Sequence, residues 1–347
     1  MSTTKAPREP GPAAPRQPTT AGLLMPGWSR YRGQPLDGSS RHSIRITGVT
    51  AGGLDAADAT GDSIDRGPGS VVTAEYFYDE GRFWRAEVPL DGVREVYGQA
   101  YNFSRIVTRK GADGPETVFT SSGLPKRSLP ILNHVQTRFR FDPREPVRLT
   151  AMDGSGDART TDDIVYSIEA AGPPGIVFNF RDAAGGNLVC AHRFMTTREM
   201  AFERLAVEGQ YVAESPLLLL EPGEERALLA KSLQRSHRAG MDEAYYLFRL
   251  CGTNNCTSNP FKILDEVVNY TWPQWLCALD YRLPLNPRLY LWLRGLDSAP
   301  GEFKLLREEF AEFLAEPDTR RRRREHVRRA IADRRQATGG DRKPSKR

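Results

Sequence analysis

The chain has 347 residues, of which 39% are hydrophobic and 27% charged, and its formal net charge is +5 at pH 7. Its four cysteines, Cys190, Cys251, Cys256 and Cys277, are too few for a disulfide framework and form no CxxC pair, so we expect neither a metal site nor a cofactor. The longest aliphatic run, Leu217 to Leu220, is far shorter than the roughly 20 residues that a membrane span requires.

The N-terminal residues 1–40 are rich in Pro, Gly, Ser and Thr, a composition that predicts a disordered arm. This stretch lacks the apolar segment of a secretory signal, so we expect a cytoplasmic protein with reduced thiols. Strand-like segments follow, and helix-like segments come after them. This order predicts a single α+β domain over residues 41–317.

The first half of the predicted domain has the pattern of an antiparallel sheet. Its segments alternate apolar and polar residues or are rich in β-branched and aromatic ones. The predicted strands cover residues 42–50, 71–78, 82–88, 93–103, 134–141, 162–170 and 175–182. Residues 51–70 and 109–130 are expected to be loops.

Helical patterns begin after residue 196, where Thr197 and Met200 start the first predicted helix. Further helices are predicted over residues 223–238, 260–268 and 303–314, the last from its 3-4-3 spacing of apolar residues. We expect these helices to pack on the sheet, and one of them to present Cys256.

Cys256 lies in the segment NNCTSNP, just before a predicted helix. Ser258 or Asn259 can cap that helix, and Pro260 suits its first turn. A helix N-terminus favours the thiolate and lowers the thiol pKa below its free value of about 8.5. Cys256 is therefore a candidate nucleophile. The local sequence supports equally well a buried cysteine that packs as a small hydrophobic residue.

A nucleophilic cysteine needs a base, which is usually histidine. The chain has five: His42, His134, His192, His237 and His326. His134 opens the strand-like segment HVQTRFRF, whose alternation places His134 and Gln136 on one face, where the imidazole can face a cleft. A partly exposed histidine at a strand end is the alternative. His42 also opens a strand, whereas the other three are expected at the surface or in structural roles.

An ordered set of motifs resembles a known family. The set comprises NHVQTRFRF, DDIVYSIEA, HRFMTTREM, EERALLAKSL, YYLFRLCGTNNCTSN and LPLNPRLYLWLRGL. It resembles the family named after the N-terminal periplasmic domain of the lacto-N-biosidase chaperone (Lnb), which is similar to permuted papain-like, NlpC-type cysteine hydrolases. The resemblance covers about residues 71–297. It implies an α+β fold in which the strand that bears the histidine precedes the helix that bears the cysteine.

The resemblance also implies roles for four residues. By their motifs, Cys256 is similar to the family's nucleophile and His134 to its base. Glu169, in the strand SIEA, would orient the imidazole, unless it is an ordinary carboxylate on a solvated face. Asn255 would hold the loop or offer an amide to an oxyanion. We then expect Cys256 to alkylate faster than the other cysteines at pH 6, and Glu169→Gln to leave stability almost unchanged.

The implied function is that of a cysteine hydrolase or acyl transferase acting on a small amide or peptide-like substrate. The chain departs from the family where Ala171 and Gly172 replace an arginine, where Glu199 replaces the commoner Asp, and in lacking a Gly-Glu-x-Tyr segment. A non-catalytic binding or chaperone-like module on the same fold is therefore an alternative. Many members of the family look periplasmic, which differs from the cytoplasmic location expected here.

Charge is concentrated at the C-terminus. Residues 318–347 hold thirteen Lys and Arg and four acidic residues, a net charge of +9, so the other 317 residues carry −4. This composition predicts a disordered tail. The tail is either a solvated extension or, through Arg320 to Arg347, a binding segment for nucleic acid or another polyanion. No disulfide is expected between Cys251 and Cys256 in a reducing compartment.

Overall fold

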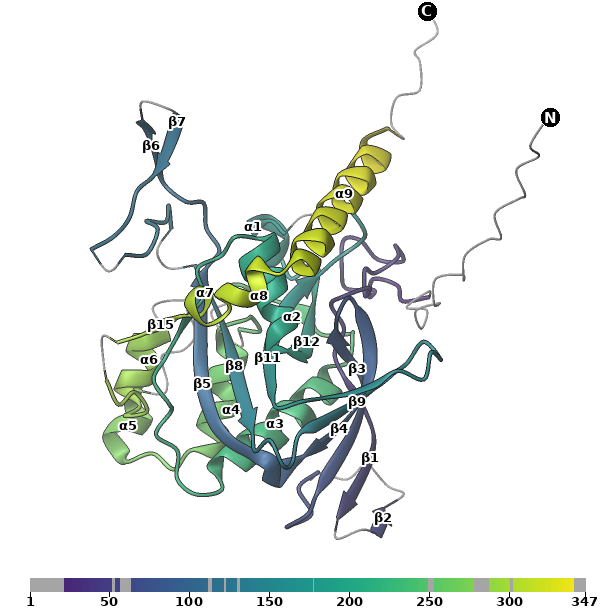
Figure 1. Ribbon diagram of the computed structural model, residues 1–347, viewed down its shortest axis with the longest axis vertical. Helices are drawn as coiled ribbons and strands as arrows, with labels where there is room; N and C mark the ends of the chain where they lie inside the picture. The colour runs from purple at the N-terminus through teal and green to yellow at the C-terminus, as the bar shows by residue number, and fades with distance from the viewer. Residues whose placement is uncertain are drawn as a thin grey trace, which may run out of the picture.

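A large, mostly antiparallel sheet with helices packed on it makes up the protein (Figure 1). The computed structural model describes residues 22–51, 54–56, 64–111, 114–121, 123–129, 132–176, 178–248, 253–277, 287–299 and 302–339. Within these residues the chain is α+β, as the order of its predicted elements indicated.

The strands of the described residues form one sheet of thirteen strands and a separate hairpin, β6–β7. Their bounds are β1 (Arg45–Ala51), β2 (Leu54–Ala56), β3 (Val71–Asp79), β4 (Arg82–Pro89), β5 (Val93–Asn102), β6 (Thr108–Gly111), β7 (Gly114–Thr117), β8 (Asn133–Phe141), β9 (Val147–Ala151), β10 (Ala158–Thr161), β11 (Asp163–Ala171), β12 (Leu188–Thr196), β13 (Ala213–Glu214), β14 (Ala244–Tyr245) and β15 (Lys304–Leu305). The main path through the sheet is β10-β9-β4-β3-β12-β11-β8-β5-β13-β15, with β1 beside β3 and β14 beside β12. Only one residue pair, Met195 with Tyr78, joins β12 to β3, and this pair is parallel.

The helices follow mostly in the second half of the chain. Their bounds are α1 (Phe180–Ala184), α2 (Thr197–Ala201), the π-helix η2 (Phe202–Val207), α3 (Glu224–Ala239), α4 (Ser258–Val267), α5 (Trp272–Cys277), α6 (Pro287–Leu293), α7 (Leu306–Glu309), α8 (Ala311–Ala315) and α9 (Pro317–Gly339), besides one 3-10 turn, η1 (Leu90–Gly92). Among the helices that the structure describes, none has both the length and the apolar character needed to span a bilayer.

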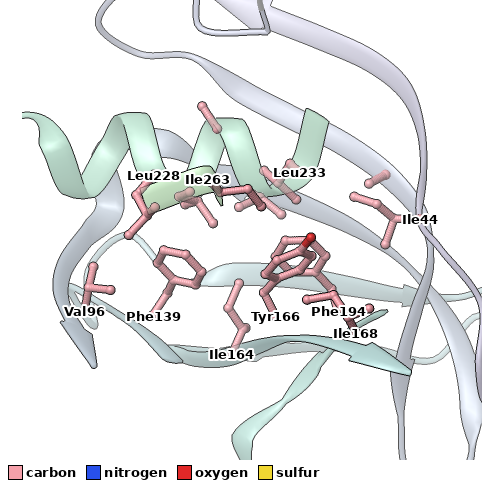
Figure 2. Packing of buried hydrophobic residues seen from close by; sticks show 14 of the residues in the cluster. Ile44, Val96, Phe139, Ile164, Tyr166, Ile168, Phe194, Leu228, Leu233 and Ile263 are labelled. Atoms are coloured by element: carbon pink, nitrogen blue, oxygen red, sulfur yellow. The ribbon is translucent and has the colours of Figure 1, made fainter. Parts of the chain in front are cut away.

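The larger hydrophobic core lies between α3, α4 and one face of the sheet (Figure 2). Leu228 and Leu233 of α3 and Ile263 of α4 lie over strand residues that include Phe139 and Tyr166. These helix residues lie on one stripe of each helix, as an amphipathic pattern requires. This face of the sheet is therefore closed by the two helices nearest to Cys256.

A second hydrophobic cluster covers the opposite face of the sheet. Val165 and Met195 pack there with Met200 of α2 and Leu205 of η2. Because both faces are covered, all nine residues of β12 are buried. Such a strand lacks the alternating pattern of a half-exposed one, and for this reason the sequence did not predict it.

Several predicted segments differ from the structure. Residues 175, 176 and 178–182, the described part of a predicted strand, do not form one, because the Asn179 side chain accepts a hydrogen bond from the Asp182 N–H at 2.9 Å and starts α1. The single helix predicted over 303–314 is divided into β15, α7 and α8, since Lys304 and Leu305 pair with β13. The stretch 109–130, expected to be a loop, contains part of the β6–β7 hairpin.

Residues 22–40, which composition placed in a disordered arm, are ordered in the structure. From residue 22 onward the chain packs on the domain, with Met25 and Leu36 buried beside Val189 and Ala191 of β12. Ser29 donates a hydrogen bond to the Asn187 carbonyl at 2.7 Å. These contacts order the segment, and its Pro/Gly-rich composition gave no sign of them. Residues 1–21 lie outside the described residues.

The basic C-terminal segment forms a helix, α9, where a disordered tail was expected, and residues 340–347 lie outside the described residues. Arg322 donates to both carboxylate oxygens of buried Glu199 at 2.7 Å, and its guanidinium lies 3.9 Å from the centre of the Phe202 ring. Thr319 is also buried. The first turns of α9 are therefore fixed to α2 and η2, while the rest of the helix projects from the body (Figure 1).

Candidate Cys–His site

The loop before α4 is held by the side chain of Asn255. Its Oδ1 atom accepts hydrogen bonds from the backbone N–H groups of Thr257 at 2.9 Å and Ser258 at 2.7 Å. Ser258 Oγ accepts in return from the Asn255 N–H at 3.1 Å, which makes a reciprocal cap. Asn255 Nδ2 donates to the Leu247 carbonyl at 2.9 Å. Asn255 was expected either to hold the loop or to offer an amide to an oxyanion, and these bonds hold the loop.

This loop places Cys256 against the free edge of β8. Strand β11 pairs with β8 only from Gln136 onward, so the edge at Asn133 is left to the loop. Thr257 Oγ1 donates to the Asn133 carbonyl at 2.8 Å, and Cys256 Sγ lies 3.9 Å from the same oxygen. Tyr245 Oη donates to Sγ at 3.4 Å. The thiol is free and only 2% exposed.

His134 and Glu169 lie close together, with Ser167 between them. The His134 Nε2 atom is 2.9 Å from Ser167 Oγ, which donates to Glu169 Oε1 at 3.0 Å. The direct distance from His134 Nε2 to Glu169 Oε1 is 3.9 Å. The Tyr101 ring, opposite His134 on β5, stacks on the imidazole with the ring centres 4.8 Å apart. The imidazole is therefore held in one orientation by a carboxylate, a hydroxyl and an aromatic ring.

Glu169 does not lie on a solvated face, which was the alternative for this residue. It is buried and forms an ion pair with Arg204 of η2. Arg193 of β12 lies 3.9 Å away and also pairs with Glu203 at 2.9 Å. Glu169 thus belongs to a buried ionic cluster as well as to the histidine chain.

Burial controls the charge of the two central groups. It raises the pKa of Cys256 to about 11 and lowers the pKa of His134 to about 4, because the charged forms lose solvation. This corrects the expectation of a stabilised thiolate. The first N–H groups of α4 bond to Asn255 rather than to Sγ, so they do not offset the burial. At pH 7 the cysteine and histidine are both neutral.

Burial alone would raise the pKa of Glu169 too, but the charges around it, Arg204 first, lower that pKa well below its usual range. Glu169 is therefore ionised at pH 7. An ionised carboxylate next to His134 favours the imidazolium if the ring takes up a proton.

The structure brings His134 and Glu169 together and places Cys256 at the edge of the same strand. Within the described residues, the hydrogen bonds of the imidazole and of the thiol go to other partners and not to each other. His42, the other strand-opening histidine, stacks on Tyr76 with ring centres 4.0 Å apart, and no contact links it to Cys256 in the part of the chain that is described. Cys251 lies outside the described residues.

Sequence analysis did not find several members of the site. Ser167 could have been found, because it lies two residues before Glu169 and alternation puts both on one strand face. Arg204 comes from a distant segment that no local pattern marks, and Tyr245, although it opens the motif YYLFRLCGTNNCTSN, gives no local sign of its contact with the thiol. Their position depends on how η2 and β14 pack on the sheet.

Comparison with known proteins gave no relatives: no family model, no curated protein and no solved structure matches the chain. The resemblance to the Lnb N-terminal domain family accordingly depends on the sequence motifs alone.

Proposed function

We propose that the protein is a cysteine hydrolase or acyl transferase that acts on amide or peptide-like carbonyls. The observation that carries the proposal is the chain from His134 through Ser167 to Glu169, next to the strand edge that holds Cys256. A nucleophile, a base and a group that orients the base are the three parts that such chemistry needs. The strand with the histidine, β8, also precedes the loop with the cysteine and the helix that follows it, α4, which is the order of permuted papain-like folds.

The neutral resting pair dictates how the reaction would proceed. Cys256 Sγ attacks the carbonyl carbon while His134 takes the thiol proton, so the thiolate forms only during attack. Ionised Glu169 stabilises the resulting imidazolium. The imidazolium then gives its proton to the leaving amine as the C–N bond breaks. Water, or a second acceptor in an acyl transferase, releases the acyl group from sulfur.

An activated ester tests this proposal without knowledge of the natural substrate. We expect p-nitrophenyl acetate to acetylate Cys256, and His134→Ala to slow this acetylation about hundredfold, because general base catalysis is lost. Mass spectrometry of peptides locates the acetyl group, and nitrophenolate release gives the rate. His42→Ala is the matched control and should leave the rate unchanged.

A non-catalytic module is the second candidate, and the burial of Cys256 as a neutral thiol favours it. In that case Cys256 and His134 would have a structural role only and would not catalyse a reaction. Equal acetylation rates in wild-type protein and His134→Ala, or acetylation only outside Cys256, would support this candidate over the hydrolase.

A polyanion-binding role for α9 is a separate proposal. Four arginines of this helix, Arg320, Arg323, Arg324 and Arg328, line an open groove beside η2 together with Arg307. None of these four forms an ion pair with a described residue, whereas Arg321 and Arg322 pair with Asp318 and Glu199. Exposed and unpaired guanidinium groups on a projecting helix suit the phosphates of a nucleic acid backbone.

Salt dependence of binding to double-stranded DNA tests this role. We expect the double substitution Arg323→Gln and Arg324→Gln to reduce the slope of log affinity against log salt by about 2, since each lost phosphate contact removes about one unit. The double substitution Arg109→Gln and Arg144→Gln, at exposed sites in β6 and in the turn before β9, makes the same charge change and should not alter the slope. Equal slopes for both double variants would contradict the proposal. Deleting α9 entirely is a poorer test, because Arg322 pairs with buried Glu199.

A further inference from the structure

A largely apolar cavity of about 170 Å³ lies between α4, α6 and one face of the sheet. Ala100 of β5 and Val135 of β8 are directly opposite each other and line this face. Leu264 of α4 and Leu291 of α6 form part of the opposite wall. Leu291 lies against Gly98 of the same sheet face, where an added Cβ atom would be 3.1 Å from the leucine side chain. An apolar cavity of about 150 Å³ holds one benzene ring, so this cavity has room for a single substituted ring.

Three of the described wall residues are charged: Arg127, Arg288 and Glu214. Glu214 directs its carboxylate away from the cavity, because it accepts from Gln99 at 2.7 Å and from Arg138 at 2.8 Å. Successive residues of a strand alternate, so Gln99 lies on the other face of the sheet. Arg288 donates to a backbone carbonyl at 2.5 Å. The charge at the cavity wall is therefore positive.

Arg127 has no acidic partner among the described residues. Its guanidinium donates to two neutral oxygens, the Ser104 carbonyl at 2.8 Å and Gln210 Oε1 at 3.1 Å. Burial lowers the pKa of Arg127, because a cation loses solvation there. A guanidinium has five N–H groups, so these two bonds leave further donors for a ligand. Arg127 is thus a half-buried cation that an anionic group would stabilise.

Arg127 lies at the more accessible end of the cavity. It is half-buried, as is the neighbouring wall residue Tyr211, whereas the wall residue Leu228 is only 2% exposed. Pro125 and Arg127 are wall residues and the intervening Lys126 is not, as alternation along an extended segment requires. A ligand can therefore place an apolar part in the buried end and a charged group at Arg127.

We propose that this cavity binds a compact apolar carboxylic acid, with its apolar part among the leucines and its carboxylate on Arg127. Arginine binds carboxylates through charge-assisted and often paired hydrogen bonds, which suits a guanidinium that holds only neutral acceptors. Both a free acid and the C-terminal residue of a peptide offer these two groups. The binding does not depend on the proposed hydrolase function, because neither Cys256 nor His134 is a wall residue among the described ones.

Phenylacetate and phenylacetamide, which are similar in shape and differ by one charge, are suitable probes. We expect calorimetry at pH 7 to show that wild-type protein binds phenylacetate more tightly. Arg127→Gln should weaken the binding of phenylacetate about tenfold, the effect of one lost charge-assisted hydrogen bond, and should change that of phenylacetamide much less. Lys126→Gln removes the same charge at an exposed residue outside the wall, so this matched control should alter neither affinity. Cys256→Ala should bind both probes as the wild type does.

A second measurement needs only wild-type protein, in case Arg127→Gln fails to fold. Phenylacetate should shift the Nε–H resonance of Arg127 in an NMR spectrum, and phenylacetamide should shift it much less. The rings of both probes should give nuclear Overhauser contacts to the methyl groups of Leu228 and Leu264. N-acetylphenylalanine, which imitates the end of a peptide, distinguishes the two sources of the ligand. Binding tighter than that of phenylacetate supports the proposal with a peptide end as the source, and weaker binding supports it with a free acid.

Three results would overturn the proposal. One is failure of phenylacetate to bind wild-type protein at millimolar concentration. Another is equal affinity for the two probes, or equal shifts of the Arg127 resonance, because the carboxylate would then have no site of its own. The third is a loss of phenylacetate affinity in Lys126→Gln as large as that in Arg127→Gln, since the overall charge of the protein would then explain both losses.

Discussion

Replacing Glu169 by Gln is expected to lower the free energy of unfolding by about 3 kcal/mol at pH 7. The carboxylate is buried, pairs with Arg204 and lies 3.9 Å from Arg193. A neutral amide leaves these buried guanidinium groups without their counter-charge, and removing one partner of a buried pair has a cost of this size. Urea denaturation of both proteins measures the difference. The burial and ion pairing of Glu169 thus replace the expectation, drawn from sequence, that stability would hardly change.

Glu208→Gln is the matched control for that substitution. Glu208 also accepts from Arg204, at 2.7 Å, but its side chain is 34% exposed. Because water screens this pair, we expect a loss below about 1 kcal/mol. Similar losses for the two variants would mean that burial does not set the strength of the Glu169 pair.

Acid should narrow the gap between wild-type protein and Glu169→Gln. The neighbouring arginines hold the pKa of Glu169 in the folded protein below its unfolded value of about 4.3. A lowered pKa gives stability that is present above the unfolded value and is lost as pH falls through the folded one. The difference in unfolding free energy should therefore be constant from pH 6 to 8 and shrink below about pH 4. A gap that stays constant down to pH 3 would argue against an ionic cause.

Cys256 is expected to alkylate with iodoacetamide about three-hundredfold more slowly than a free thiol at pH 7. Burial raises its pKa to about 11, against about 8.5 for an ordinary cysteine, so only about 0.01% of the molecules carry the thiolate. The labelling rate should rise about tenfold per pH unit up to pH 10. Mass spectrometry of peptides from timed samples gives the rate for each cysteine.

Two comparisons make the labelling experiment specific. Cys190 is fully buried with a pKa raised further by desolvation, so it should react more slowly than Cys256 at every pH. His134→Ala should hardly change alkylation, because iodoacetamide reacts with the preformed thiolate and a histidine with a pKa of about 4 supplies no positive charge to stabilise that thiolate at pH 7. Rapid labelling of Cys256 at pH 6 that depends on His134 would instead show that the pair is ionised and accessible in solution.

Alternation or richness in β-branched and aromatic residues predicted strands β3, β4, β5, β8 and β11, and with them the mostly antiparallel sheet. Strand β12, which is buried along its whole length under α2 and α3, was not predicted. Residues 175–182 were predicted as a strand from their β-branched and aromatic composition. The hydrogen bond that Asn179 accepts from the Asp182 N–H caps helix α1 there, and composition alone does not show this bond.

The candidate site was predictable only in part. Motif order and strand alternation indicated His134 and Glu169, which lie 3.9 Å apart. The charge states were not predictable, because they depend on burial by segments far along the chain. Arg204 keeps Glu169 ionised although this carboxylate is buried. Burial raises the pKa of Cys256 even though Tyr245 donates a hydrogen bond to the thiol.

The single parallel pair between β12 and β3 suggests an order of assembly for the sheet. Met195 and Tyr78 form this pair, and the hydrogen bond from Thr196 to Asp79 beside it joins residues 117 positions apart. Within the part of the sheet on each side of this pair, some strands that follow one another in sequence, such as β3 and β4, are joined by short turns. Because the entropy lost in closing a loop grows with its length, each half of the sheet can form before the two meet. The β3–β12 seam, like the β5–β13 pairing that joins residues almost as far apart, is then expected to close late during folding.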